Sequence, residues 1–119
     1  MQEAKIEPRE LADRLMELVA GKKAGRIVLL DLGGISLIAD YFLICSGESE
    51  RQLQAISDEV QEKTKAQGVP PRRVEGSADS GWVLMDFGAV ILHVFDLVQR
   101  DRYQLERLWS MARTVAVMP

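Results

Sequence analysis

Several acids and one histidine lie between residues 75 and 96, and these side chains are the ones most able to do chemistry. Asp86 begins an Asp-Phe-Gly tripeptide, which binds magnesium in protein kinases, but neither a glycine-rich loop nor a catalytic loop accompanies it. A nucleotidyltransferase needs two acids at alternate strand positions to hold metal ions, and Asp86 has only Gly88 there. We therefore expect no catalytic residue, no cofactor and no enzymatic activity.

His93 and Cys45 are the only histidine and the only cysteine. Neither has the partners that a zinc site requires, so we expect no bound metal. Cys45 stands inside an apolar run without a basic neighbour to activate it, which is typical of a small buried hydrophobic residue. His93 has two open interpretations, a core histidine or part of a binding surface.

The stretch from Gly81 to Phe95 predicts a β-hairpin, with Phe87 and Gly88 taken as its turn residues. In that register Leu84 faces Ile91 and Trp82 faces His93. Because side chains alternate along strands, one hairpin face is wholly apolar and should be buried. It carries Val83, Met85, Val90, Leu92 and Val94.

The other hairpin face mixes large apolar groups with an acid and the histidine, which favours a docking surface. It carries Trp82, Leu84, Asp86, Ile91, His93 and Phe95. Trp82 is the expected anchor, exposed until a partner docks. Glu75, Asp79 and Asp96 flank the hairpin and, with Asp86, should face a basic partner.

The remaining pattern predicts a mixed α/β fold with helices packed on one side of a β-sheet. Helices are expected over residues 8–21, 49–68 and 103–109, and strands over 26–32, 40–46 and 72–75. Ser49 and Gln52 form a capping box, and the thin apolar stripe that follows should cover a sheet edge. Residues 76–80 and 96–101 are interpreted as polar loops, and 115–119 as a tail.

Composition limits the function classes. The 119 residues suit a single domain, 1–119, and the net charge of −3 argues against nucleic acid as the main partner while suiting a basic protein. No apolar run is long enough to span a membrane. The amino-terminal residues, Met1 to Glu7, resemble neither a signal peptide nor a transit peptide, so we expect a cytoplasmic protein.

Several short motifs together resemble the Iojap family, the ribosomal silencing factors. They occur in family order over nearly the whole chain. The motifs are Asp40-Tyr41-Phe42, Ser46-Gly47 with Ser49-Glu50-Arg51, Glu75-Gly76, Gly81 to Gly88, His93-Val94-Phe95, Arg102-Tyr103 and Leu105 to Trp109. At the hairpin tip, Phe87 and Ala89 stand where the family usually has Tyr and often an acid.

The resemblance implies a nucleotidyltransferase-like fold without the enzyme's active site. It also implies binding to the large ribosomal subunit through its protein number fourteen, a basic ribosomal protein, with at most a minor contact to ribosomal RNA. Exclusion of the small subunit would then repress translation when nutrients are scarce. A homodimer in the free state and no small-molecule substrate are further implications.

Two other hypotheses stay open at this point. One is an inactive nucleotidyltransferase-like interaction domain that acts in large-subunit assembly or binds some other protein. The other is a nucleotidyltransferase with an unrecognised site.

Overall fold

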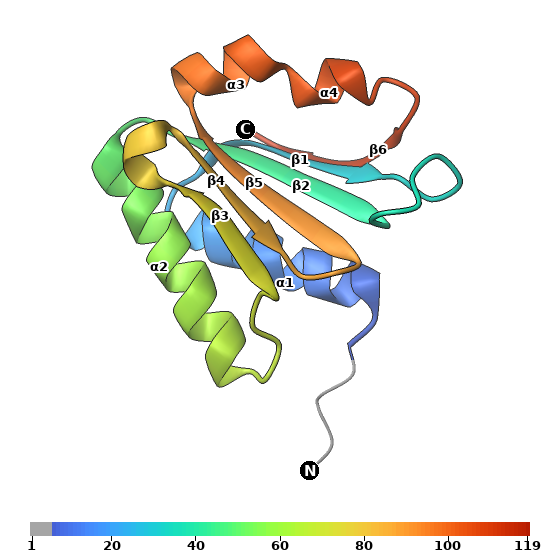
Figure 1. The fold of residues 1–119 in the computed structure, drawn as a ribbon, viewed down its shortest axis with the longest axis horizontal. Helices are drawn as coiled ribbons and strands as arrows, with labels where there is room; N and C mark the ends of the chain where they lie inside the picture. The colour runs from blue at the N-terminus through green and yellow to red at the C-terminus, as the bar shows by residue number, and fades with distance from the viewer. Residues whose placement is uncertain (1–5) are drawn as a thin grey trace.

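The computed structural model describes residues 6–119, so most of the amino-terminal segment interpreted above lies outside the described residues. A mixed six-stranded sheet is covered by helices on both faces (Figure 1). The elements in chain order are α1 (Pro8–Gly21), β1 (Gly25–Asp31), β2 (Tyr41–Gly47), α2 (Glu50–Ala66), β3 (Arg73–Ser77), the 3-10 turn η1 (Ala78–Ser80), β4 (Trp82–Asp86), β5 (Val90–Asp96), α3 (Leu97–Tyr103), α4 (Leu105–Leu108) and β6 (Arg113–Met118).

The strand order in the sheet is β3-β4-β5-β2-β1-β6. The central pair, β2 and β5, is parallel, and the other pairs are antiparallel. The expected α/β class with a mixed sheet is confirmed. Within the described residues, no helix combines the length and apolarity that crossing a bilayer requires.

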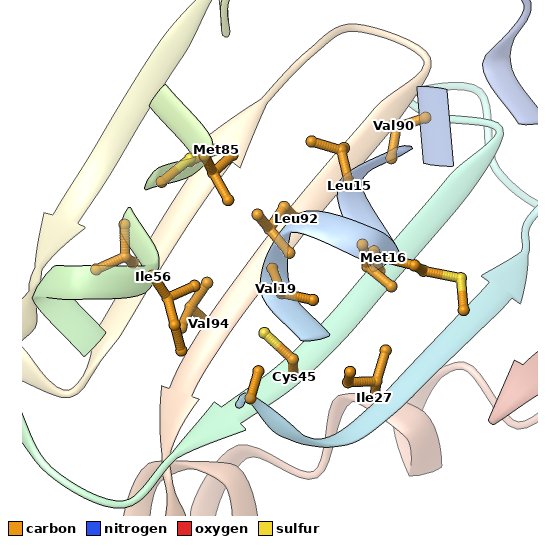
Figure 2. Close-up of a cluster of buried hydrophobic side chains, with 14 of the residues drawn as sticks. Leu15, Met16, Val19, Ile27, Cys45, Ile56, Met85, Val90, Leu92 and Val94 are labelled. Carbon is orange, nitrogen blue, oxygen red and sulfur yellow. The ribbon is translucent and has the colours of Figure 1, made fainter. Parts of the chain in front are cut away.

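The main core lies between the sheet and the helices α1 and α2. We call the side of the sheet that these two helices cover the first face. Leu15 and Val19 of α1 contact the side of the sheet that carries Leu92 and Val94 (Figure 2). All five residues of the predicted apolar hairpin face are buried there, as expected. Cys45 belongs to the same cluster, and its burial raises the pKa of the thiol to about 12.

Helix α2 begins as predicted, because the hydroxyl of Ser49 accepts a hydrogen bond of 3.0 Å from the backbone N–H of Gln52. The Gln52 side chain accepts from the N–H of Glu48, so the return bond is one residue earlier than a capping box requires. The expectation that α2 covers only a sheet edge was wrong. Its stripe is fully buried in the core, because it packs beside α1 across the sheet.

Three carboxyl-terminal predictions were wrong. The helix expected over 103–109 is divided, because Gln104 has a left-handed conformation between the end of α3 and the start of α4. Residues 96–101 are not a polar loop, because the carboxylate of Asp96 caps a helix that begins at Leu97, by accepting from the N–H of Gln99 at 2.7 Å. The segment interpreted as a tail is strand β6, which pairs with β1 along the edge of the sheet. Its alternating Val115 and Val117 were the available signal.

The placement of helices on one side only was also wrong. Helices α3 and α4 lie over the second face of the sheet, opposite α1 and α2 (Figure 1). This second face is the one that the sequence marked as a docking surface.

Candidate functional site

The pairing of β4 with β5 determines which side chains of the second face lie opposite one another. Asp86 pairs with Ile91, Leu84 with His93, and Trp82 with Phe95. The predicted partners were therefore wrong by two residues, and the turn is Gly88-Ala89. Because the shift is even, each side chain stays on its predicted face.

The turn lies one residue later than predicted for two physical reasons. Gly88 has a φ of 89°, which favours glycine, and this residue opens the turn. Phe87 is buried in the core, and its N–H donates to the carbonyl of Val90 at 2.9 Å, which closes the hairpin one pair beyond Asp86.

Helix α3 divides the predicted docking residues into buried and accessible ones. Phe95 is 0% exposed and His93 4% exposed, so the expectation that both face a partner directly was wrong. The helix that follows β5 places Tyr103 against the rings of Phe95 and Trp82, with centroids 6.1 Å and 4.6 Å away. His93 is enclosed by Phe42, Trp82 and Phe95. Trp82, Leu84, Asp86 and Ile91 are half-buried and keep part of their surface accessible.

His93 lies within an aromatic cluster. Its ring meets the edge of Phe42 at a centroid distance of 4.6 Å, and its Nδ1 accepts a hydrogen bond of 3.3 Å from the indole N–H of Trp82. Burial lowers the pKa of His93 from 6.5 to about 4, so the imidazole is neutral at neutral pH. No partner among the described residues reaches Nε2.

A groove of about 290 Å³ opens beside Trp82, between the β3–β4 edge of the sheet and α3. Its lining combines aromatic and aliphatic side chains with polar ones and one acid. The residues are Glu75, Gly76, Ser80, Trp82, Leu84, Gln99 and Tyr103. Sequence reasoning placed Tyr103 in a helix and in the Arg102-Tyr103 motif, but not at the docking surface. Its spacing of four from Gln99 would have placed both residues on one helical face, had the Asp96 cap been recognised.

The four flanking acids have different roles. Asp86 accepts the N–H of Gly88 at 2.7 Å and lies 3.6 Å from the guanidinium of Arg73, so it stabilises the hairpin tip. Asp96 is committed to the cap of α3. Glu75 and Asp79 are exposed, with Glu75 at the groove and 3.7 Å from the same Arg73 guanidinium, and Asp79 accepting from the hydroxyl of Ser77.

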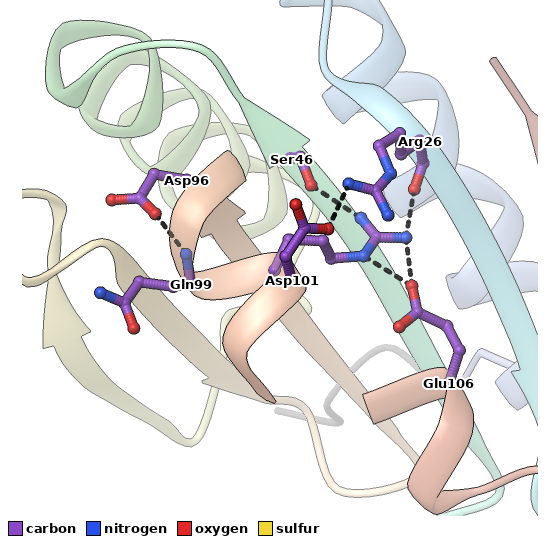
Figure 3. A network of polar contacts seen from close by, with 7 residues as sticks. Arg26, Ser46, Asp96, Gln99, Asp101 and Glu106 are labelled. Carbon is purple, nitrogen blue, oxygen red and sulfur yellow. Dashed lines mark hydrogen bonds and ion pairs between the residues drawn. The ribbon is translucent and has the colours of Figure 1, made fainter. Parts of the chain in front are cut away.

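A buried arginine fixes the helical layer above this surface. Arg100 of α3 is 2% exposed and donates to the hydroxyl of Ser46 at 2.8 Å and to the carbonyl of Arg26 at 2.7 Å (Figure 3). It also donates to Glu106 of α4 at 2.5 Å. One guanidinium thus joins both helices to β1 and β2, which holds Tyr103 at the groove.

The described residues offer no arrangement suited to metal chemistry. Across residues 6–119, no three His, Cys, Asp or Glu side chains converge closely enough to hold a metal ion. What the groove offers is aromatic surface, a hydrogen-bonding rim and a carboxylate, which suits recognition of a partner.

Comparison with known proteins gives a consistent result. Residues 5–118 match the family model described as "Ribosomal silencing factor during starvation". The chain is 47% identical over 107 residues to the ribosomal silencing factor RsfS of Halalkalibacterium halodurans, covering 90% of this chain and 92% of that protein. A mouse protein named "Mitochondrial assembly of ribosomal large subunit protein 1" is 29% identical over 102 residues, 45% of its length.

Solved structures agree. A crystal structure from Bacillus halodurans superposes with a TM-score of 0.80 at 44% identity, covering 91% of this chain and 98% of that one. One from Chromobacterium violaceum gives a TM-score of 0.84 at 30% identity, covering 96% and 94%. The family model, the similar relative and the superposed structures lead to one conclusion: the chain belongs to the family of ribosomal silencing factors.

Proposed function

We propose that this protein lowers translation by binding the large ribosomal subunit through its protein number fourteen and excluding the small subunit. Membership of the family of ribosomal silencing factors supports ribosome silencing. The resemblance to the Iojap family suggests the large subunit as the target and its protein number fourteen as the binding partner. The observation that carries the proposal is the groove lined by Trp82 and Tyr103, because it offers a partner aromatic, hydrogen-bonding and acidic groups on one accessible surface.

The chemistry of the groove suits a basic side chain of the partner. A lysine or arginine that enters it would meet the aromatic surfaces of Trp82 and Tyr103 and the carboxylate of Glu75. Asp79 is exposed on the adjoining turn η1 and adds negative charge. Such an arrangement would both steer a basic ribosomal protein to the surface and anchor it.

Binding is tested by sedimentation of the purified protein with large subunits, and silencing by the yield of joined ribosomes when small subunits are added. We expect co-sedimentation and a concentration-dependent fall in subunit joining. Failure to co-sediment at low salt would contradict the proposal. Co-sedimentation with normal subunit joining would leave binding intact and refute steric exclusion.

A charge-matched pair of variants isolates the acidic rim. Glu75→Gln with Asp79→Asn removes two exposed charges at the groove, whereas Asp58→Asn with Glu62→Gln removes two from the exposed side of α2, on the opposite face. Rim charges act mainly on association, so the first pair should slow binding and flatten its salt dependence. Equal association rates for the two variants at low salt would argue against a basic partner at the groove.

Assistance in large-subunit assembly is the second candidate function, and the name of the mouse relative favours it. Depleting the protein during growth separates the two functions. An accumulation of incomplete large subunits would indicate assembly, whereas unchanged subunits with unrestrained translation under starvation would indicate silencing.

We further expect a cytoplasmic protein that is a homodimer when free, with at most a minor contact to ribosomal RNA and no nucleotide turnover. Sedimentation equilibrium tests the dimer, and calorimetry with nucleotide and magnesium tests the absence of a nucleotide site. Transfer of a nucleotidyl group that disappears in Asp86→Ala would contradict the last expectation.

A further inference from the structure

The indole N–H of Trp82 makes one hydrogen bond, and its acceptor belongs to a buried residue. The indole N–H donates to Nδ1 of His93 at 3.3 Å, and His93 is 4% exposed. The two residues are not a cross-strand pair, since Trp82 pairs with Phe95 and His93 with Leu84. The indole therefore leans diagonally across the hairpin to make this bond.

The bond determines which nitrogen of His93 carries the proton. Because Nδ1 is the acceptor, the neutral imidazole must carry its proton on Nε2. No partner among the described residues accepts that Nε2 proton, although the atom is buried. A buried donor without an acceptor is costly, whereas Nδ1 of the same ring offsets this cost by accepting from the part-buried indole N–H of Trp82.

We propose that His93 is a positioning residue, whose Nδ1 holds the Trp82 ring in the orientation that forms the docking groove. This inference rests on the proposed function, in which the groove receives the partner. Trp82 lines the groove between Leu84 of its own strand and Tyr103 of α3. Rotation of the indole about its side-chain torsions would remove the aromatic wall that faces Tyr103.

The physical benefit is preorganisation. A half-buried tryptophan that moved freely between rotamers would lose that freedom on binding, and the loss would weaken affinity. Contacts with Phe95, at a ring-centroid distance of 4.9 Å, and with Tyr103 at 4.6 Å pack the indole but tolerate sliding. The directional bond to His93 selects one orientation among those that packing allows.

Two substitutions separate this role from a packing role. His93→Asn places a carbonyl oxygen near the position of Nδ1 and so keeps the acceptor, although it removes part of the ring. His93→Leu keeps apolar bulk, removes the acceptor and also removes the unpartnered N–H. If His93 acts through Trp82, binding should follow the presence of the acceptor, whereas stability should favour the apolar residue.

The first measurement needs no ribosome. The chain has two tryptophans, so a proton–nitrogen spectrum contains two indole signals, and Trp109→Phe identifies the one from Trp82. We expect the Trp82 indole proton to be protected from solvent exchange in the wild type and in His93→Asn, and to exchange faster in His93→Leu. Unchanged protection in His93→Leu would mean that no such bond holds the ring, and would overturn the proposal.

The second measurement is the affinity for purified large subunits together with the unfolding free energy of each variant. We expect His93→Leu to bind about five- to tenfold more weakly, the effect of roughly one hydrogen bond, and His93→Asn to stay nearer the wild type. An affinity that instead tracks stability across the three proteins would make His93 structural and overturn the proposal. Trp82→Ala separates the failure of this proposal from the failure of the proposed function. Normal binding of that variant to large subunits would show that the groove is not the docking site.

Discussion

Acidification should destabilise this protein through His93, because burial favours the uncharged imidazole. The pKa of His93 falls from an ordinary 6.5 to about 4 in the folded protein. The unfolded chain therefore binds more protons than the folded one between these two values. Stability contributed by the neutral ring is complete above pH 6.5 and is lost as the pH falls toward 4.

The magnitude follows from the two pKa values. Integrating the proton difference gives a loss of about 2 kcal/mol at about pH 5 and about 3 kcal/mol at about pH 4, relative to neutral pH. The neighbours of the ring are Phe42, Trp82 and Phe95, which carry no charge to offset this cost. The loss is a large fraction of the stability of a small domain.

The assay is urea denaturation at a series of pH values, for the wild type and for His93→Leu. Carboxylates titrate in both proteins, so the difference between the two stability curves isolates His93. We expect that difference to grow steadily below about pH 6 in favour of the leucine variant. Parallel curves from neutral to acid pH would mean that His93 titrates alike in both states, and would refute the assignment of a buried neutral ring.

Three further predictions follow from the same structure. Val83→Ala should lower the unfolding free energy by about 1–3 kcal/mol through a cavity on the first face, and leave large-subunit binding nearly unchanged; a binding loss as large as that of Trp82→Ala would contradict the separation of faces. Arg100→Met should lower the unfolding free energy by about 3 kcal/mol and loosen α3, measured by thermal unfolding and by faster exchange of its amides; wild-type values in both would show that the buried network is dispensable. Cys45 should react with thiol reagents only after denaturation, because burial raises the pKa of the thiol to about 12; rapid labelling of the native protein would disprove its burial.

Much of the first face was predictable, because local pattern and tertiary environment agree there. Leu11, Leu15 and Val19 recur at helical spacing, and the apolar side of the hairpin alternates as a half-buried strand does. Those patterns place a helix on a sheet without further information. The two-residue shift in hairpin register left every side chain on its predicted face, since the side-chain period of a strand is two.

The second face was less predictable, because its burial depends on a helix with little pattern of its own. Leu97 and Val98 of α3 are exposed, and its most buried side chain is an arginine, Arg100. Hydrophobic periodicity cannot detect this helix, because it is attached to the sheet by hydrogen bonds and not by an apolar stripe. The guanidinium of Arg100 donates to the hydroxyl of Ser46 and to a backbone carbonyl. Only the cap residue Asp96 signalled it, and a single cap is a weak signal beside a polar stretch.

The same missing helix explains why Phe95, which was predicted to face a partner, is buried instead. A strand face that carries tryptophan, histidine and phenylalanine without a visible cover is interpreted as exposed and therefore as an interface. With α3 in place, Phe95 and His93 become the support, and Trp82 with Leu84 remains at the surface beside Tyr103. The mixed composition of that face thus reflects two layers, a buried aromatic layer and a half-buried outer layer. A binding surface built in this way can be rigid without being wholly buried, which is the property that a docking site needs to keep its affinity.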